Sequence, residues 1–228
     1  MENKHDLTRG VITPQLIKLA LPLMGTAFIQ MSYNLMDMFW LGKLSTDSLA
    51  AAASSGYITW LAMAFVLMIR TGTEIGVGHS VGARKEDELH QYISTALTFS
   101  LILGGLYALV MVLFRVPIIG FFNFKEEIIR SQAHSYLTVV ALGYPFFFIN
   151  PILGGIYHGA GNSKMPFLIN SVGLVMNMVL DPVFIFGLKM GVQGAALATA
   201  LANFTISLIY YLMRHGEPVL FSKLHLLR

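Results

Sequence analysis

The chain consists of long apolar runs separated by short polar connections. Each run is close to the roughly 20 residues that an α-helix needs to cross a bilayer, and none alternates polar and apolar residues as a β-barrel strand does. The pattern predicts membrane-spanning helices at residues 14–41, 49–69 with a less apolar extension toward 81, 92–114, 133–156, 167–186 and 192–213. Because short connections join antiparallel neighbours, we expect an all-α, up-and-down bundle of six transmembrane helices.

The composition agrees with a membrane protein, whose main partner is the lipid bilayer. Hydrophobic residues make up 55% of the chain and charged residues 12%, with a mean hydropathy of +0.66, whereas soluble domains average roughly 25% charged residues. The net charge of +3 is spread between the runs and forms no basic face, so we expect no nucleic-acid partner. Absence of cysteine excludes disulfides and thiol catalysis.

Three segments are predicted along the chain: a cytoplasmic N-terminal segment at residues 1–13, a six-span lobe at 14–213, and the start of a cytoplasmic linker at 214–228. Residues 1–15 lack the order of regions that marks a signal peptide. Lysine and arginine are more frequent at the ends and in the even-numbered connections than in the odd-numbered ones. By the positive-inside rule we therefore expect both ends on the cytoplasmic side.

Two predicted spans carry an aspartate on a polar stripe. The stripe of the first span consists of Gln30, Tyr33, Asn34 and Asp37. In the fifth span, Asn177 and Asp181 are four residues apart and therefore share one helix face. A charged side chain in the bilayer centre costs about 2.5 to 3.5 kcal/mol on insertion scales, and such residues mark ion or proton pathways. The alternative, in which each aspartate caps a helix or bonds across a helix interface, stays open.

Three polar groups from different spans fall at similar depths. Asp37, Asp181 and Thr199 are expected roughly 6, 9 and 12 Å below the outer surface at 1.5 Å per residue. Together with Asn177 they would offer hard oxygen ligands, which suit a cation such as sodium, and two adjacent acids would also suit proton exchange. We therefore predict a site for Na⁺ or H⁺ at Asp37, Asn177, Asp181 and Thr199, and the residues do not choose between these ions.

Two prolines lie inside predicted spans. Pro22 and Pro182 each remove a backbone hydrogen bond and tend to kink a helix, so they are candidate hinges, with inert packing kinks as the alternative. Tyr136 in the fourth span could face a cavity or belong to the aromatic belt. Arg70 and Glu74, four residues apart, are expected to form a local ion pair or to extend toward the membrane interface.

Enzymatic function is not expected. No nucleophile and base occur at reactive spacing, and no phosphate-binding glycine loop ends in Gly-Lys-Ser/Thr, so we expect no cofactor and no direct use of ATP. A six-span channel or a non-transporting membrane subunit is the alternative to a transporter. Neither a continuous polar pore stripe nor a selectivity-filter segment is evident.

Several motifs together resemble one family across nearly the whole chain. They are Leu19-Ala-Leu-Pro22, Tyr33–Gly42, Gly159–Lys164, Asn177–Pro182 and Gly191-Val-Gln-Gly-Ala-Ala. In this order and spacing they resemble the multidrug and toxic compound extrusion (MATE) transporters, most closely the branch related to the DNA-damage-inducible membrane protein. The resemblance implies a polyspecific efflux antiporter for organic, often cationic compounds, driven by inward Na⁺ or H⁺ movement in the cytoplasmic membrane of a prokaryote.

The resemblance also implies roles for individual residues. It places the cation site of the N-terminal lobe at Asp37, Asn177, Asp181 and Thr199, and a first-helix kink at Pro22. The substrate cavity would be lined by Gln30, Tyr33, Asn34 and Tyr136. Family members have two six-helix lobes, whereas this chain provides one. We therefore expect either the N-terminal half of a longer protein or a half-size transporter that pairs with a second copy, and favour the first.

Overall fold

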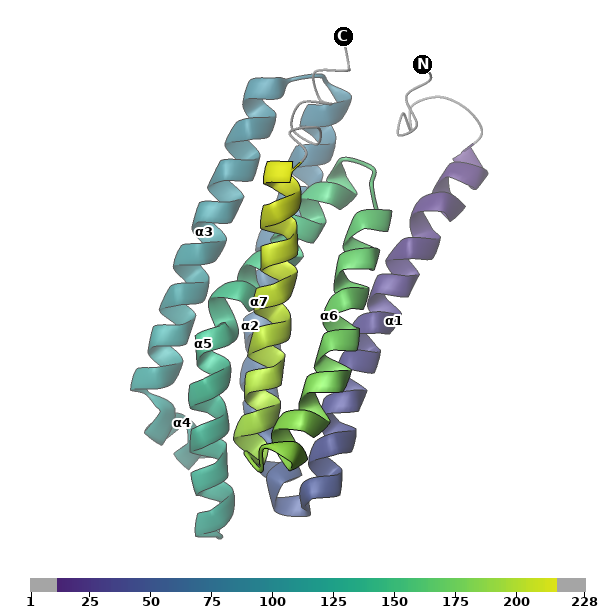
Figure 1. Ribbon diagram of the computed structural model, residues 1–228. Helices are drawn as coiled ribbons and strands as arrows, with labels where there is room; N and C mark the ends of the chain where they lie inside the picture. Colours follow the sequence, from purple (N-terminus) through teal and green to yellow (C-terminus); the bar gives the residue numbers. More distant parts are fainter. Residues whose placement is uncertain (1–11, 217–228) are drawn as a thin grey trace.

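The computed structural model describes residues 12–216, which fold into seven α-helices and one π-helical segment (Figure 1). The elements are α1 (Ile12–Leu44), α2 (Thr46–Gly82), α3 (Glu86–Leu113), α4 (Arg115–Phe121), α5 (Glu127–Gly159), α6 (Lys164–Pro182), η1 (Val183–Gly187) and α7 (Val192–Gly216). The predicted terminal segments 1–13 and 214–228 lie largely outside the described residues.

The six long helices run alternately up and down, as the short connections predict (Figure 1). The turn between α1 and α2 is a single residue, Ser45, whose hydroxyl accepts a hydrogen bond from the Ser48 amide at 3.0 Å and so caps α2. The all-α bundle is confirmed. With α6 and η1 taken together, each long helix exceeds the apolar run from which it was predicted, because polar residues extend the ends of most of them.

Five of the long helices, α2, α3, α5, α6 with η1, and α7, are long and apolar enough to cross a membrane. α1 has 33 residues and is therefore also long enough to span a bilayer. The polar stripe of Gln30, Tyr33, Asn34 and Asp37 lies in its second half. The position and length of α1 agree with the predicted first span.

Two elements were not predicted. α4 is a helix of seven residues in the connection between α3 and α5, and it is too short for an analysis of membrane-length runs to find. η1 follows Pro182 directly and continues α6 with wider π-type turns.

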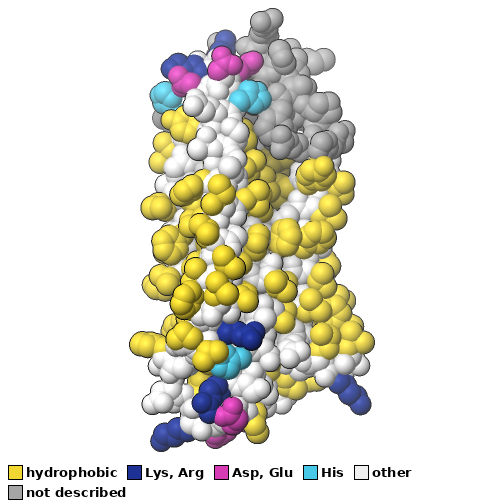
Figure 2. All heavy atoms as spheres, turned by 90° about the vertical axis from the view of Figure 1, so that its left-hand side faces the viewer, with side chains coloured by type: hydrophobic (Ala, Val, Ile, Leu, Met, Phe, Trp, Pro, Cys, Tyr) yellow, Lys and Arg dark blue, Asp and Glu magenta, His cyan; other side chains and the backbone are white. Residues whose placement is uncertain are grey.

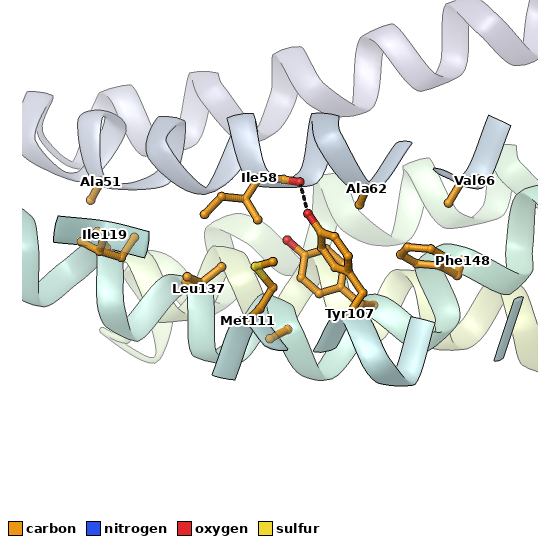
Figure 3. Packing of buried hydrophobic residues seen from close by; sticks show 12 residues of the cluster. Ala51, Ile58, Ala62, Val66, Tyr107, Met111, Ile119, Leu137 and Phe148 are labelled. Carbon is orange, nitrogen blue, oxygen red and sulfur yellow. Dashed lines mark hydrogen bonds between the residues drawn. The ribbon is translucent and has the colours of Figure 1, made fainter. Parts of the chain in front are cut away.

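α5 forms the centre of the bundle and packs against α2, α3 and α7 (Figure 1). The largest cluster of buried hydrophobic residues in the bundle lies between α2, α3, α4 and α5. In this cluster Ile58 and Val66 of α2 face Tyr107, Leu137 and Phe148 (Figure 3). The Tyr107 hydroxyl lies in this cluster and donates a hydrogen bond to the Ile58 carbonyl at 2.6 Å. One polar contact thus ties α3 to α2 inside an apolar core.

Removing that hydroxyl should weaken the bundle modestly. We expect Tyr107→Phe to lower the free energy of unfolding by about 1 kcal/mol, because a buried helix–helix hydrogen bond contributes about that much in proteins and membranes. Unfolding in mixed micelles by a denaturing detergent measures the change. Tyr57→Phe is the control, since Tyr57 is 70% exposed. Equal stability of Tyr107→Phe and Tyr57→Phe would contradict a stabilising role for the hydrogen bond from Tyr107 to the Ile58 carbonyl.

The surface matches a protein that crosses the bilayer. On the face that Figure 2 shows, charged side chains lie toward the two ends of the bundle, and hydrophobic side chains cover the length between them. Arg70 lies within α2 and pairs with Glu74 at 3.8 Å, which confirms the predicted ion pair. Its guanidinium also hydrogen-bonds His158 of α5 at 3.2 Å, so it joins two helices.

Candidate cation site

The structure brings the four predicted cation-site residues together where α1, α6 and α7 approach one another. Thr199 donates a hydrogen bond from its hydroxyl to an Asp37 carboxylate oxygen at 3.4 Å, and Asn177 donates from its amide to Asp181 at 3.2 Å. The Asp37 carboxyl also interacts with Asp181 and Asn177. These contacts join α1 to both α6 and α7 through one polar cluster.

All three residues that were placed by depth lie near the same end of the bundle. Asp37 and Thr199 are each seven residues from a helix end, or about 10 Å along the axis, and Asp181 is the penultimate residue of α6. Asn177 and Asp181 are fully buried. The estimate of a shared layer from sequence is therefore correct in the structure.

The cluster has oxygen atoms available to a cation or proton. Among the described residues, one oxygen each of Asp37, Asn177 and Asp181 is buried without a hydrogen-bond partner. Among the side chains that the structure describes, no lysine or arginine forms an ion pair with either aspartate. Two adjacent carboxylates repel each other when both are charged, so a cation or a shared proton would relieve that repulsion. The donor set of carboxylate, amide and hydroxyl oxygens fits a hard cation.

The predicted cavity residues divide into two groups. Tyr136 is buried on α5 and interacts with Asp37, while Tyr33 is half-buried and donates to the Thr199 carbonyl at 3.4 Å. Both tyrosines therefore belong to the wall of the cation site. Gln30 and Asn34 are exposed on α1, on the surface of this chain. A cavity of about 230 Å³ lies elsewhere, between α3, α5 and α7, and none of the four lines it.

The end of the site nearest the α1–α2 turn is closed by apolar side chains. Leu41, Ala52, Ile185, Val192 and Ala195 form a buried cluster together with Tyr136. Trp40 packs edge-on against Phe186 at 6.2 Å between ring centres. This layer, which we call the apolar floor, separates the aspartates from that end of the bundle.

A very close backbone contact positions Asp181 above the floor. At Gly194 of α7, a Cβ atom would lie 2.7 Å from the Phe184 carbonyl carbon and 2.9 Å from the Ile185 nitrogen. Only a glycine fits there, so α7 packs directly against the backbone of η1. Because η1 begins two residues after Asp181, this contact also fixes the end of α6 at the site.

The two candidate hinges differ in their surroundings. α1 continues through Pro22, whose carbonyl accepts a hydrogen bond from the Thr26 hydroxyl at 3.0 Å. Pro182 is the last residue of α6, and the helix changes to π-type turns directly after it. The expected irregularity is therefore present at Pro182. Movement about either proline stays a prediction.

Three polar residues next to the site were missed. Asn203 and Ser207 follow Thr199 at intervals of four, and Asn150 of α5 hydrogen-bonds to both. The four-residue spacing of Thr199, Asn203 and Ser207 within an apolar span was a visible signal. Asn150 stands alone in a phenylalanine-rich run and offered no comparable pattern.

Comparison with known proteins identifies the family. The MatE family model matches residues 22–183, which include Asp37, Asn177 and Asp181. The chain belongs to the MatE family. The resemblance inferred from its motifs is thereby confirmed, and MatE membership together with the apolar helices makes it a multi-pass membrane protein.

Curated MatE relatives are similar over most of this chain. The "Probable multidrug resistance protein YoeA" of Bacillus subtilis is 30% identical over 209 residues, covering 89% of this chain and 45% of the relative. The "DNA damage-inducible protein F" of Escherichia coli is 30% identical over 202 residues, covering 86% and 42%. The chain spans about half the length of the curated relatives that it matches.

Solved MatE structures share the fold. A crystal structure of MATE in complex with MaD3S superposes with a TM-score of 0.86 at 29% identity, covering 92% of this chain and 47% of that one. A MATE in the bent conformation gives 0.85 at 29% identity, and one in the straight conformation gives 0.82 at 30%, with the same coverage of both chains. The bundle is therefore one lobe of the two-lobe MATE fold.

Proposed function

We propose that this chain is the N-terminal lobe of a multidrug efflux antiporter that exchanges organic, often cationic compounds for Na⁺ or H⁺ by alternating access. The observation that carries the proposal is the meeting of Asp37 and Asp181, from two helices, in one buried cluster with unpartnered oxygens. Buried carboxylates of this kind in membrane helices mark ion and proton pathways. The names of the relatives, which include multidrug resistance proteins, support the substrate class.

The contacts suggest how binding could be coupled to movement. α1 is joined to α7 by two hydrogen bonds at this site, from Thr199 to Asp37 and from Tyr33 to the Thr199 carbonyl. A bound cation or proton neutralises the repulsion between Asp37 and Asp181 and lets α1 remain packed on α6 and α7. When the ion leaves, the two carboxylates repel and α1 is released.

α1 is suited to such a change because much of its surface is free. Leu21, Met24, Phe28 and Met31 are each more than half exposed in this chain. Pro22 within α1 and Pro182 at the end of α6 would act as hinges for this movement. The existence of solved MATE structures in bent and straight conformations, both similar to this chain, supports a family member with two conformations.

A drug-sized cavity requires a second lobe in this proposal. The relatives are about twice as long as the matched region, so the partner is a C-terminal lobe or, in a half-size transporter, a second copy of this chain. Gln30 and Asn34, exposed on α1, would then line the space between the lobes, with Tyr33 and Tyr136 at its inner wall. Both termini of this segment would face the cytoplasm of a prokaryotic cell.

Gradient-driven efflux tests the proposal. The two-lobe transporter that contains this chain is prepared in inside-out membrane vesicles that contain no ATP. Accumulation of ethidium in the vesicles is followed after a proton or sodium gradient is imposed. We expect uptake with one of the two gradients and its loss when an ionophore collapses that gradient. Equal ethidium movement with and without gradients would contradict antiport, and a steady ionic current without ethidium would favour a channel.

A further inference from the structure

A fully hydrogen-bonded polar network lies beside the candidate cation site, between α5 and α7. At its centre is Asn150, which is 7% exposed. Its amide nitrogen donates to the Asn203 backbone carbonyl at 2.9 Å and to the Asn203 side-chain oxygen at 3.3 Å. Its oxygen accepts a hydrogen bond from Ser207 at 2.6 Å. Asn150 therefore forms hydrogen bonds to two consecutive turns of α7.

The network continues from Asn203 to the site. The Asn203 amide donates to the Thr199 carbonyl at 3.0 Å, and the same carbonyl accepts the Tyr33 hydroxyl of α1. The Thr199 hydroxyl in turn donates to Asp37. Two sets of hydrogen bonds, which meet at the backbone carbonyl and the hydroxyl of Thr199, thus connect α5 through α7 to the carboxylate on α1.

This arrangement does more than satisfy the buried amide of Asn150. A side-chain amide needs partners for two N–H groups and one oxygen, and bonds of this kind contribute only about 0.6 kcal/mol on average in membranes. Here the partners of Asn150 among the described residues lie on one face of α7, where Thr199, Asn203 and Ser207 follow one another at intervals of four residues. The consequence is a fixed rotation of α7, with the Thr199 hydroxyl directed at Asp37.

We propose that Asn150 is a positioning residue of the cation site: through Asn203 it sets the orientation of Thr199, and thereby the affinity for the cation. The inference rests on the proposed function of Asp37 and Asp181 as the ion-binding pair. Asn150 does not touch the ion in this assignment. Residues that orient metal ligands from outside typically change affinity about 10- to 100-fold when they are removed.

Trp40 provides a reporter for the experiment. The chain has two tryptophans, and Trp60 is 78% exposed, so Trp60→Phe leaves Trp40 alone. Trp40 is three residues from Asp37 and contacts Phe186 of η1, and its fluorescence should respond to ion binding. The full chain in lipid nanodiscs is titrated with sodium chloride against choline chloride at constant ionic strength, and separately with pH.

In this background Asn150→Leu should weaken the apparent affinity for sodium, or shift the midpoint of the pH titration, by about tenfold. Thr199→Ala should have a similar effect, and the double variant should be no weaker than either single variant, because Asn150 acts through Thr199. Asn170→Leu is the matched control, since the Asn170 amide donates within α6, to the Pro166 carbonyl at 2.7 Å, and forms no hydrogen bond to α7 or to the site among the described residues. The affinity of Asn170→Leu for sodium should equal that of the parent protein, which carries Trp60→Phe alone.

The outcomes separate the two proposals. A parent protein that responds to neither sodium nor pH contradicts the ion-coupled function itself. A responsive parent with unchanged affinity in Asn150→Leu, or with additive losses in the double variant, overturns the positioning role alone. Ser207→Ala keeps the test decisive if Asn150→Leu does not fold, because it removes one bond to Asn150 and should weaken affinity by about threefold. Unchanged affinity there also overturns the role.

Discussion

Asp181→Asn is expected to abolish ion-coupled efflux by the two-lobe transporter, lowering gradient-driven ethidium transport at least about 100-fold. Asparagine has almost the same shape as aspartate, so the fully buried position should stay packed. The amide carries no charge and takes up no proton at physiological pH, so the site loses the group that the driving ion neutralises. Transport in vesicles under the imposed gradient measures the loss.

Asp37→Asn should have the same effect, because the mechanism requires both carboxylates. The double variant should be no worse than either single variant, as expected for groups that act together. Asp47→Asn is the control: Asp47 lies in the first turn of α2, near the same end of the bundle but outside the site. Coupled efflux that survives in both Asp37→Asn and Asp181→Asn would remove this pair from the mechanism.

The second large effect should come from Gly194→Ala, which is expected to lower the stability of the bundle by about 3 kcal/mol and to weaken ion binding as well. The added methyl group would meet the backbone of Phe184 and Ile185 at 2.7 to 2.9 Å, and a backbone cannot rotate away as a side chain can. Overpacking of a tight contact usually costs about 1 to 3 kcal/mol. Displacement of η1 would also move Asp181.

A matched control lies in the same segment. Gly187→Ala places its methyl group where no atom lies within 4 Å among the described residues, so stability and ion affinity should both stay unchanged. Unfolding in mixed micelles and sodium titration of the Trp40 signal measure the two properties. If Gly194→Ala were as stable as Gly187→Ala, the direct packing of α7 on η1 would be contradicted.

Much of the site could be predicted because helices in a membrane share one coordinate, the depth. Asp37, Asp181 and Thr199 are far apart in sequence, yet their distances from the span ends were enough to place them in one layer, and the structure brings them together. Depth does not say which way each helix is rotated about its own axis. For α6 the rotation could be predicted in part, because Asn177 and Asp181 are four residues apart and therefore share one face.

What could not be predicted depended on contacts rather than on pattern. Asn150 is a single amide in an apolar run, and only the structure shows that its partners are Asn203 and Ser207. η1 packs its backbone against Gly194, a contact that no periodicity reveals. Gln30 and Asn34 share the stripe of Asp37, yet they are exposed, because α1 borders the bundle on only part of its circumference.

The polar stripe of α1 has a consequence for how the protein is made. α1 is synthesised before α6, its main neighbour in the bundle, and Asp37 is costly to leave in lipid alone. α6 leaves the ribosome only after α2, α3, α4 and α5. We therefore expect α1 to stay near the translocation machinery until α6 is available to pack against it.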